Sequence, residues 1–378
     1  MTAFVRTRPR PHARAALAAA TLLASLAAAA GAQGQSGGSP SAPPASDPTA
    51  GLTVRQLIGQ RVIYAYAGTR PPLVLEQRIR AGEAAGVILF ARNIASRPAL
   101  RATMRRLQAI PRPAALRDPL LVMIDQEGGL VKRLSGAPLR APADLGRIGS
   151  IALARSEGQA TARNLLDVGV NVNLAPVVDT GRPGSYQQRT RRSYSSRSST
   201  VSALGSAFVR GMQERGVAGT LKHFPGLGTV TRDEDALVQV VSVSLPTLRA
   251  FDEAPFAAGI RAGAALVMTS TARYPGLSPR PALLSPAIST TELRTRLGFR
   301  GVSITDDLEV PALRRYGPTD RLGLLAAQAG NDLLLYAGNY VSGARAVDLL
   351  SREVAAGRLS LAATRASVRR VLALRAGL

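Results

Sequence analysis

Short apolar runs recur along the chain from residue 51 onward, and longer amphipathic stretches separate them. Eight of the runs have the length and β-branched content of buried strands: 61–66, 86–90, 120–124, 170–174, 218–221, 265–268, 301–305 and 332–336. Helical periodicity is clearest between them at 96–109, 151–166, 200–215, 245–262 and 342–356. Continuous apolar strands that alternate with helices are typical of a parallel sheet covered on both faces.

The number of strand–helix units indicates how this sheet is organised. Eight units within residues 51–378 predict the α/β class, and within it a single (β/α)₈ barrel domain of the TIM type. A doubly wound sheet is the structural alternative. The first strand is followed by no glycine-rich phosphate fingerprint, which disfavours that alternative.

The first fifty residues have a different composition and predict two further segments. Residues 1–32 combine four arginines, an Ala/Leu-rich run and the small-residue sequence Ala30-Gly31-Ala32, which together predict a cleaved secretory signal peptide. An uncleaved anchor is the alternative. Residues 33–50 are rich in Gly, Ser, Pro and Ala and predict a disordered linker. We therefore expect residues 51–378 to act outside the cytoplasm, secreted or associated with the cell envelope, without stable membrane insertion.

The charge of the chain limits its partners. The formal net charge is +24, but the arginines are scattered and no aromatic-interleaved basic motif or zinc spacing accompanies them. We therefore expect no nucleic-acid binding and only a loose attraction to anionic envelope polymers. The chain contains no cysteine, so the domain must be stable without disulfides. We expect a monomer.

Polar residues follow five of the predicted strands at the points where those strands end. They are Asp125 and Glu127, Asn173 and Asp179, Lys222 and His223, Thr269 and Ser270, and Asp306 and Asp307. In a barrel these positions converge on the C-terminal rim, where active sites are built. An aspartate at a strand end is often only a helix N-cap. Helix capping explains any one of these residues more easily than all of them together, so the pattern predicts an active site.

One of these positions stands out by composition. The chain has 46 arginines but only two lysines, Lys132 and Lys222, and its two histidines are His12 and His223. Lysine is a compact point charge and histidine titrates near neutrality, whereas arginine keeps its proton. The adjacent pair Lys222-His223 therefore predicts a polar pocket.

Three motifs carry a resemblance to a known family. The segments Asp125-Gln126-Glu127-Gly128-Gly129, Lys222-His223-Phe224-Pro225-Gly226 and Ile304-Thr305-Asp306-Asp307-Leu308 resemble those of family 3 glycoside hydrolases. The similarity is greatest to the single-domain bacterial β-N-acetylhexosaminidases, and it extends in the same order over almost all of residues 51–378.

The resemblance implies an activity and a set of site residues. It implies hydrolysis of terminal β-linked N-acetylglucosamine, from cell-wall or chitin-type saccharides, with retention through a covalent intermediate on Asp306. Asp307 is expected to cap or orient the following helix. The sugar-binding positions of the family correspond to Asp125, Arg133, Arg192, Lys222 and His223. The resemblance implies a carbohydrate substrate and neither a metal nor an organic cofactor.

The sequence departs from the family in the loop that follows Lys222-His223. The family has Asp-Ser-His there, with the histidine as acid/base and the aspartate as its orienting partner. This chain has Asp233-Glu234-Asp235, so an aspartate stands at the histidine position and Asp233 keeps the partner position. Three interpretations follow: Asp235 or Glu234 is the acid/base, the protein binds sugar without cleaving it, or a residue elsewhere protonates the leaving group.

Overall fold

The computed structural model describes residues 47–378. The predicted signal peptide and most of the predicted linker lie outside the described residues. All eight predicted strands are confirmed, with bounds β1 Val62–Tyr64, β2 Gly86–Leu89, β3 Leu121–Ile124, β6 Val172–Asn173, β7 Ala218–Phe224, β8 Leu266–Thr269, β11 Val302–Thr305 and β12 Leu334–Tyr336.

These strands form a parallel (β/α)₈ barrel. Their order in the sheet is β11-β8-β7-β6-β3-β2-β1-β12, and every neighbouring pair is parallel. A parallel bridge between Ile304 and Leu333 joins the two ends, with the amide of Thr305 donating to the carbonyl of Leu333 at 3.0 Å. Because the two edges of the sheet meet, the doubly wound alternative is wrong.

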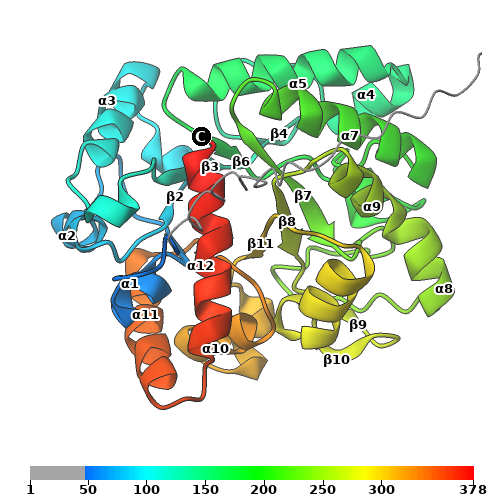
Figure 1. Cartoon of the computed structure of the whole chain (residues 1–378). Helices are drawn as coiled ribbons and strands as arrows, with labels where there is room; N and C mark the ends of the chain where they lie inside the picture. Colours follow the sequence, from blue (N-terminus) through cyan, green and yellow to red (C-terminus); the bar gives the residue numbers. More distant parts are fainter. Residues whose placement is uncertain (1–46) are drawn as a thin grey trace, which may run out of the picture. The chain divides into compact units, whose positions relative to one another are not determined.

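Helices surround the strands as an outer layer (Figure 1). The structure contains α1 Val54–Gly59, α2 Leu73–Ala81, α3 Arg97–Gln108, α4 Pro142–Ile148, α5 Ile151–Leu166, α6 Tyr186–Arg189, α7 Ser198–Gln213, α8 Leu245–Thr247, α9 Ala254–Arg261, α10 Thr319–Gln328, α11 Tyr340–Ala355 and α12 Leu361–Ala376. Four of the five predicted helices are continuous. The predicted helix at 245–262 is divided into α8, a π-helical segment and α9, because Pro255 has no amide hydrogen and suits only the first turn of a helix.

Alternate residues of each strand enter different clusters, as the pleat of a strand requires. Ile63, Ile88 and Met123 belong to a cluster inside the barrel, whereas Val62 and Tyr64 pack toward the helices. Val371 of α12 joins the interior cluster, and Arg375 of the same helix donates to the carbonyl of Pro119. Helix α12 therefore covers the N-terminal end of the barrel, which leaves the C-terminal end for the site.

The N-terminal boundary of the packed domain differs from the predicted one. Residues 47–50, the last four of the predicted linker, include a turn. Thr49 is fully buried, and Arg365 of α12 donates to its carbonyl at 2.6 Å. Arg369 pairs with Asp47 at 2.9 Å. The packed domain therefore includes these four residues, which anchor the chain to α12. None of the helices within residues 47–378 has the length and apolar character of a membrane-spanning segment.

Candidate functional site

A cavity of about 370 Å³ lies at the C-terminal ends of the strands. Its lining includes every residue predicted to act in catalysis or sugar binding: Asp125, Arg133, Arg192, Lys222, His223, Asp233, Asp235 and Asp306. These residues come from loops after β3, β6 and β11, and from β7 and the loop that follows it. Barrel closure thus brings into one cavity residues that are far apart in the sequence.

A buried ion network forms the polar wall of the cavity. Lys222 Nζ lies 2.7 Å from Asp125 Oδ1 and 2.8 Å from Glu127 Oε1. Arg192 makes a bidentate interaction with Glu127, from Nε to Oε2 at 2.9 Å and from Nη2 to Oε1 at 2.8 Å. Burial opposes ionisation of Glu127, but Arg192 and Lys222 outweigh it and hold the pKa of Glu127 below its ordinary value. Likewise, burial lowers the pKa of Lys222, but Asp125 and Glu127 outweigh it, so the net pKa is raised. Glu127, Lys222 and Arg192 therefore remain charged at neutral pH.

The short hairpin after β3 positions Arg133. Its strands, β4 Gln126–Gly128 and β5 Val131–Lys132, are tied together by the buried side chain of Gln126. Gln126 Oε1 accepts from the amides of Arg133 and Leu134 at 2.9 and 3.0 Å, and its Nε2 donates to the Leu134 carbonyl at 2.8 Å. The guanidinium of Arg133 then reaches the cavity, with Nη2 3.8 Å from Asp125 Oδ2.

His223 is oriented by a buried carboxylate. Its Nδ1 lies 2.7 Å from Asp179 Oδ2, while Asp179 Oδ1 accepts from the amides of His223 and Leu227 at 3.2 and 2.8 Å. Because a carboxylate with these amide donors acts as an acceptor, Nδ1 carries the proton. The second ring nitrogen, Nε2, is therefore available to the cavity, 3.9 Å from Glu234 Oε1.

The loop with the unusual acidic triplet is held by one internal contact and by contacts from three other segments. Asp233 accepts from the amide of Asp235 and from the hydroxyl of Tyr186, both at 3.2 Å, and the carbonyl of Asp235 accepts from the amide of Ala312 at 3.2 Å. Glu234 Oε2 accepts from the amide and hydroxyl of Thr271 at 3.1 and 2.9 Å. Glu234 is consequently buried, whereas Asp233 and Asp235 remain exposed on one side.

Two of these acids have raised pKa values. Burial, followed by the carboxylates of Asp306 and Asp235, raises the pKa of Glu234 well above its ordinary value. Asp235 keeps one side open to solvent, yet the protein packed around its other side and the nearby Asp306 and Asp233 raise its pKa to about 8. Asp235 therefore holds a proton at neutral pH and can donate it, and the pKa of Glu234 is shifted in the same direction.

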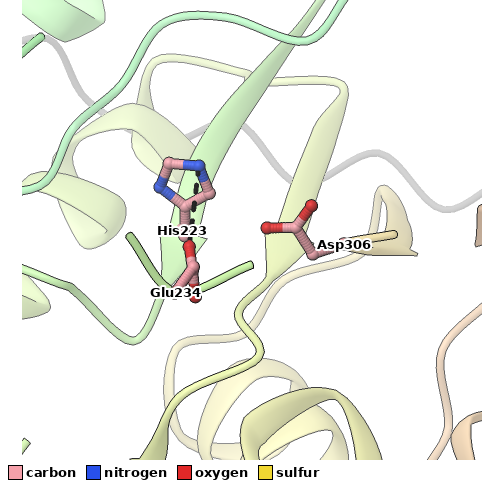
Figure 2. Close-up of side chains that lie close together, drawn as sticks. All are labelled: His223, Glu234 and Asp306. Atoms are coloured by element: carbon pink, nitrogen blue, oxygen red, sulfur yellow. Dashed lines mark ion pairs between the residues drawn. The ribbon is translucent and has the colours of Figure 1, made fainter. Parts of the chain in front are cut away.

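The two adjacent aspartates after β11 have different surroundings. Asp306 continues the pairing of β11 with β8 through its amide, which donates to the Thr269 carbonyl at 3.0 Å, and its side chain faces His223 and Glu234 (Figure 2). Asp307 Oδ1 instead accepts from the amides of Glu309 and Ala337 at 2.9 and 3.0 Å. Asp307 thus ties the loop after β11 to the end of β12.

Glu127 and Asp179 follow strand ends in the sequence but had no predicted role. In the structure they position three of the predicted sugar-binding residues: Glu127 joins Lys222 to Arg192, and Asp179 orients His223. The signal available in the sequence was adjacency to the motifs, because Glu127 lies inside Asp125–Gly129 and Asp179 closely follows β6. Thr271, which holds Glu234, belongs to a separate loop after β8 and had no such signal.

The cavity combines an ion network, in which each charged group is held by its partners, with the carboxyl group of Asp306 on another wall. The network around Glu127 presents donors and acceptors at one wall, and a hydroxyl-rich ligand needs many such directional partners. Across the cavity, Asp306 lies near Glu234 and Asp235, two acids whose pKa values are raised. A nucleophilic carboxylate near a proton donor is the minimum that a retaining glycosidase requires.

The chain is similar in sequence to a known protein family and to a secreted relative. The model of the glycosyl hydrolase family 3 N-terminal domain matches residues 53–374. An uncharacterized secreted glycosyl hydrolase of Arthroderma benhamiae is 38% identical over 339 residues, which cover 88% of this chain and 96% of that protein.

Two solved structures extend the comparison. The β-N-acetylhexosaminidase of Beutenbergia cavernae superposes with a TM-score of 0.79 at 33% identity, covering 86% of this chain and 98% of that one. A family 3 β-N-acetylglucosaminidase from Paenibacillus gives a TM-score of 0.81 at 34% identity over 86% of this chain, which spans 63% of that protein. Fold, strand-end site and sequence agree, and the chain belongs to glycosyl hydrolase family 3.

Proposed function

We propose that this glycosyl hydrolase releases terminal β-linked N-acetylglucosamine from cell-wall or chitin-type saccharides with retention of configuration. The observation that carries the proposal is the juxtaposition of Asp306 with Glu234 and Asp235, two acids of raised pKa, in a cavity lined by fixed hydrogen-bond partners. The hexosaminidase and N-acetylglucosaminidase relatives support the choice of sugar.

The ion network binds the terminal sugar in this proposal. Asp125 accepts hydrogen bonds from sugar hydroxyls, while Lys222, Arg133 and Arg192 donate to them. The charges already compensate one another through Glu127, so the site does not need to reorganise when the sugar enters. His223, fixed by Asp179, offers Nε2 as an acceptor to a further hydroxyl.

Asp306 is the proposed nucleophile. One of its carboxylate oxygens attacks the anomeric carbon, the glycosidic C–O bond breaks, and the leaving oxygen takes a proton from the acid. Water then attacks the anomeric carbon and releases Asp306, while the same acid, now deprotonated, takes the proton of that water. The amide of Asp307, 2.8 Å from Asp306 Oδ1, orients the carboxylate for the first step.

Asp235 is the proposed acid/base. Its pKa of about 8 keeps it protonated near neutrality and still lets it act as a base in the second step. It lies at the solvent-facing side of the cavity, where a leaving group departs, and its main chain is held by Asp233 and Ala312.

Glu234 is the competing candidate, favoured by one observation. A carboxylate oxygen of Glu234 and one of Asp306 lie within 4.8 Å of each other, near the ~5 Å separation of the two carboxyl groups in retaining enzymes. Against it, Glu234 is buried and its other oxygen is bound by Thr271.

A leaving-group comparison tests the proposal. Turnover of an aryl β-N-acetylglucosaminide and of chitobiose would be measured for wild type, Asp306→Ala, Asp235→Asn and Glu234→Gln. We expect Asp306→Ala to lose both activities, and Asp235→Asn to lose about 10²–10⁴-fold on chitobiose but far less on the aryl substrate, which needs little protonation. The same split in Glu234→Gln alone would reassign the acid. A wild-type protein that binds N-acetylglucosamine but cleaves neither substrate would be a sugar-binding homologue.

We further propose that the enzyme works outside the cytoplasm after removal of residues 1–32. The support is the basic, apolar and small-residue order of that segment and the secreted relative from Arthroderma benhamiae. Expression of the full chain in a bacterial host, followed by fractionation and N-terminal sequencing, tests it. A mature start near Gln33 supports export with cleavage, whereas an intact Met1 in the membrane fraction would indicate an anchor.

A further inference from the structure

Three side chains in the cavity each direct one atom that can bind a metal ion toward a common point. His223 Nε2, a carboxylate oxygen of Glu234 and a carboxylate oxygen of Asp306 all lie within 4.8 Å of one another (Figure 2). His223 and Glu234 are 4% and 6% exposed. Among residues 47–378, neither Nε2 of His223 nor Oε1 of Glu234 makes a hydrogen bond; their mutual approach is 3.9 Å.

Each of the three side chains is fixed through its other polar atom. Asp179 holds His223 at Nδ1, Thr271 holds Glu234 at Oε2, and the amide of Asp307 holds Asp306 at Oδ1. Second contacts of this kind set the tautomer of a metal-binding histidine and the direction of its carboxylate neighbours. The donor atoms that remain are therefore oriented toward one another.

The charge at this point is unbalanced. Two cations of the cavity wall, Lys222 and Arg192, are already engaged by Asp125 and Glu127, and a third, Arg133, lies 3.8 Å from Asp125. The side chain of Asp179, which is bound to His223 Nδ1, places a further carboxyl group next to this point. A divalent cation at this point would place a positive charge between Glu234 and Asp306.

We propose that His223, Glu234 and Asp306 form a binding site for a divalent transition-metal ion of the Zn²⁺ class. One imidazole nitrogen and two carboxylate oxygens suit Zn²⁺, whereas Mg²⁺ and Ca²⁺ prefer oxygen ligands alone. Ligands ~2.1 Å from a tetrahedral Zn²⁺ stand ~3.4 Å apart, so the 3.9 Å between His223 and Glu234 needs only a small closure. The open cavity leaves the fourth position to water.

The ion would inhibit hydrolysis, a consequence that rests on the proposed function. An Asp306 oxygen that binds metal cannot attack the anomeric carbon, and the ion would occupy space next to the sugar. Metal binding and glycoside binding are therefore expected to exclude each other. The ion is not a cofactor of the proposed reaction.

The test measures Zn²⁺ binding directly, without substrate. Equilibrium dialysis at pH 7.5 would use tag-free protein as wild type, Glu234→Gln, and Glu214→Gln, an exposed control at the end of α7. We expect one Zn²⁺ per chain, no Mg²⁺, binding weakened roughly tenfold or more in Glu234→Gln, and no change in Glu214→Gln. Circular dichroism and urea unfolding would verify that each variant is folded. No binding by wild type, or equal binding by wild type and Glu234→Gln, would overturn the site.

Kinetics then separate this inference from the proposed function. With an active wild type, Zn²⁺ should inhibit the aryl substrate competitively, a chelator should reverse the inhibition, and Asp235→Asn should retain Zn²⁺ binding by dialysis. A protein that binds Zn²⁺ through Glu234 but cleaves no glycoside would keep the metal site and refute the function. An active enzyme that binds no Zn²⁺ would refute the metal site alone.

Discussion

Asp179 Oδ2 lies 2.7 Å from His223 Nδ1, and the other oxygen of Asp179 accepts from two main-chain amides. This one carboxylate therefore fixes both the tautomer of the histidine and the turn that follows β7. A residue with no predicted role thus determines which ring nitrogen faces the cavity.

Replacing Asp179 should reduce both stability and activity. Asp179→Ala leaves the buried Nδ1–H and the amides of His223 and Leu227 without an acceptor, at about 1–3 kcal/mol for such a buried group. Asp179→Asn keeps the volume but lets the side chain donate, so it should disturb the tautomer more than the fold. We expect urea unfolding to separate the two variants, with a loss of kcat/KM in both. Wild-type kcat/KM in Asp179→Asn would contradict the orienting role.

The alkaline limb of activity should follow Asp235. Its pKa of about 8 lies above the ordinary value of 3.8, so the folded protein retains the proton up to that pH. For chitobiose, kcat/KM should fall about tenfold per pH unit above pH 8, because the acid form is lost. For the aryl substrate, kcat/KM should fall far less over the same pH range, because its leaving group needs little protonation. In Asp235→Asn this limb should disappear, and its persistence there would assign the titration to another group.

The same shift predicts a change in stability with pH. A carboxyl group whose pKa is raised by folding disfavours the folded state once the unfolded group ionises, so its cost grows from pH 3.8 up to the folded pKa. Asp235→Asn should therefore gain stability over wild type as pH rises from 4 to 8 and differ little below 4. Thermal unfolding over this range measures the difference, and equal pH profiles would contradict the raised pKa.

Of the residues in the ion network, Glu127 should lower the free energy of unfolding most when it is removed. Glu127→Ala would leave Lys222 and Arg192 buried with only Asp125 to compensate them, and breaking a buried ion pair costs about 3–5 kcal/mol. The midpoint of urea unfolding should fall accordingly. Glu214→Ala, which removes an exposed partner of Arg155, should leave the midpoint unchanged. A loss in Glu127→Ala no larger than in this control would indicate that the network is not stabilising.

Substitutions of the two adjacent aspartates should differ in effect: Asp307→Ala should lower stability, whereas Asp306→Ala should abolish activity. Asp307→Ala removes the acceptor of the Glu309 and Ala337 amides and should destabilise the protein by about 1–3 kcal/mol. Asp306→Ala removes a carboxylate that repels Glu234 and Asp235, so it should abolish turnover without lowering the unfolding midpoint. A covalent 2-fluoro-sugar adduct on any residue other than Asp306 would refute the nucleophile.

Local sequence pattern predicted the strands of this chain better than its helix breaks and its linker boundary. All eight strands could be predicted because each is a continuous apolar run and both faces of a barrel strand are buried. The helix predicted at 245–262 was only partly right, because periodicity does not register the hydrogen bond that Pro255 cannot make. The linker boundary was four residues too late, since Thr49 looks like a loop residue until α12 packs against it.

By itself, the sequence determined the barrel, the rim on which the polar residues gather and the eight side chains predicted to act there. These features depend on local periodicity and on the order of motifs along the chain. Only the tertiary structure decided which charges meet: Glu127 with Arg192, 65 positions away, and Glu234 with Thr271, 37 positions away. Such pairings arise when barrel closure removes side chains from water, because a buried charge or polar atom must then find its partner wherever the fold supplies one.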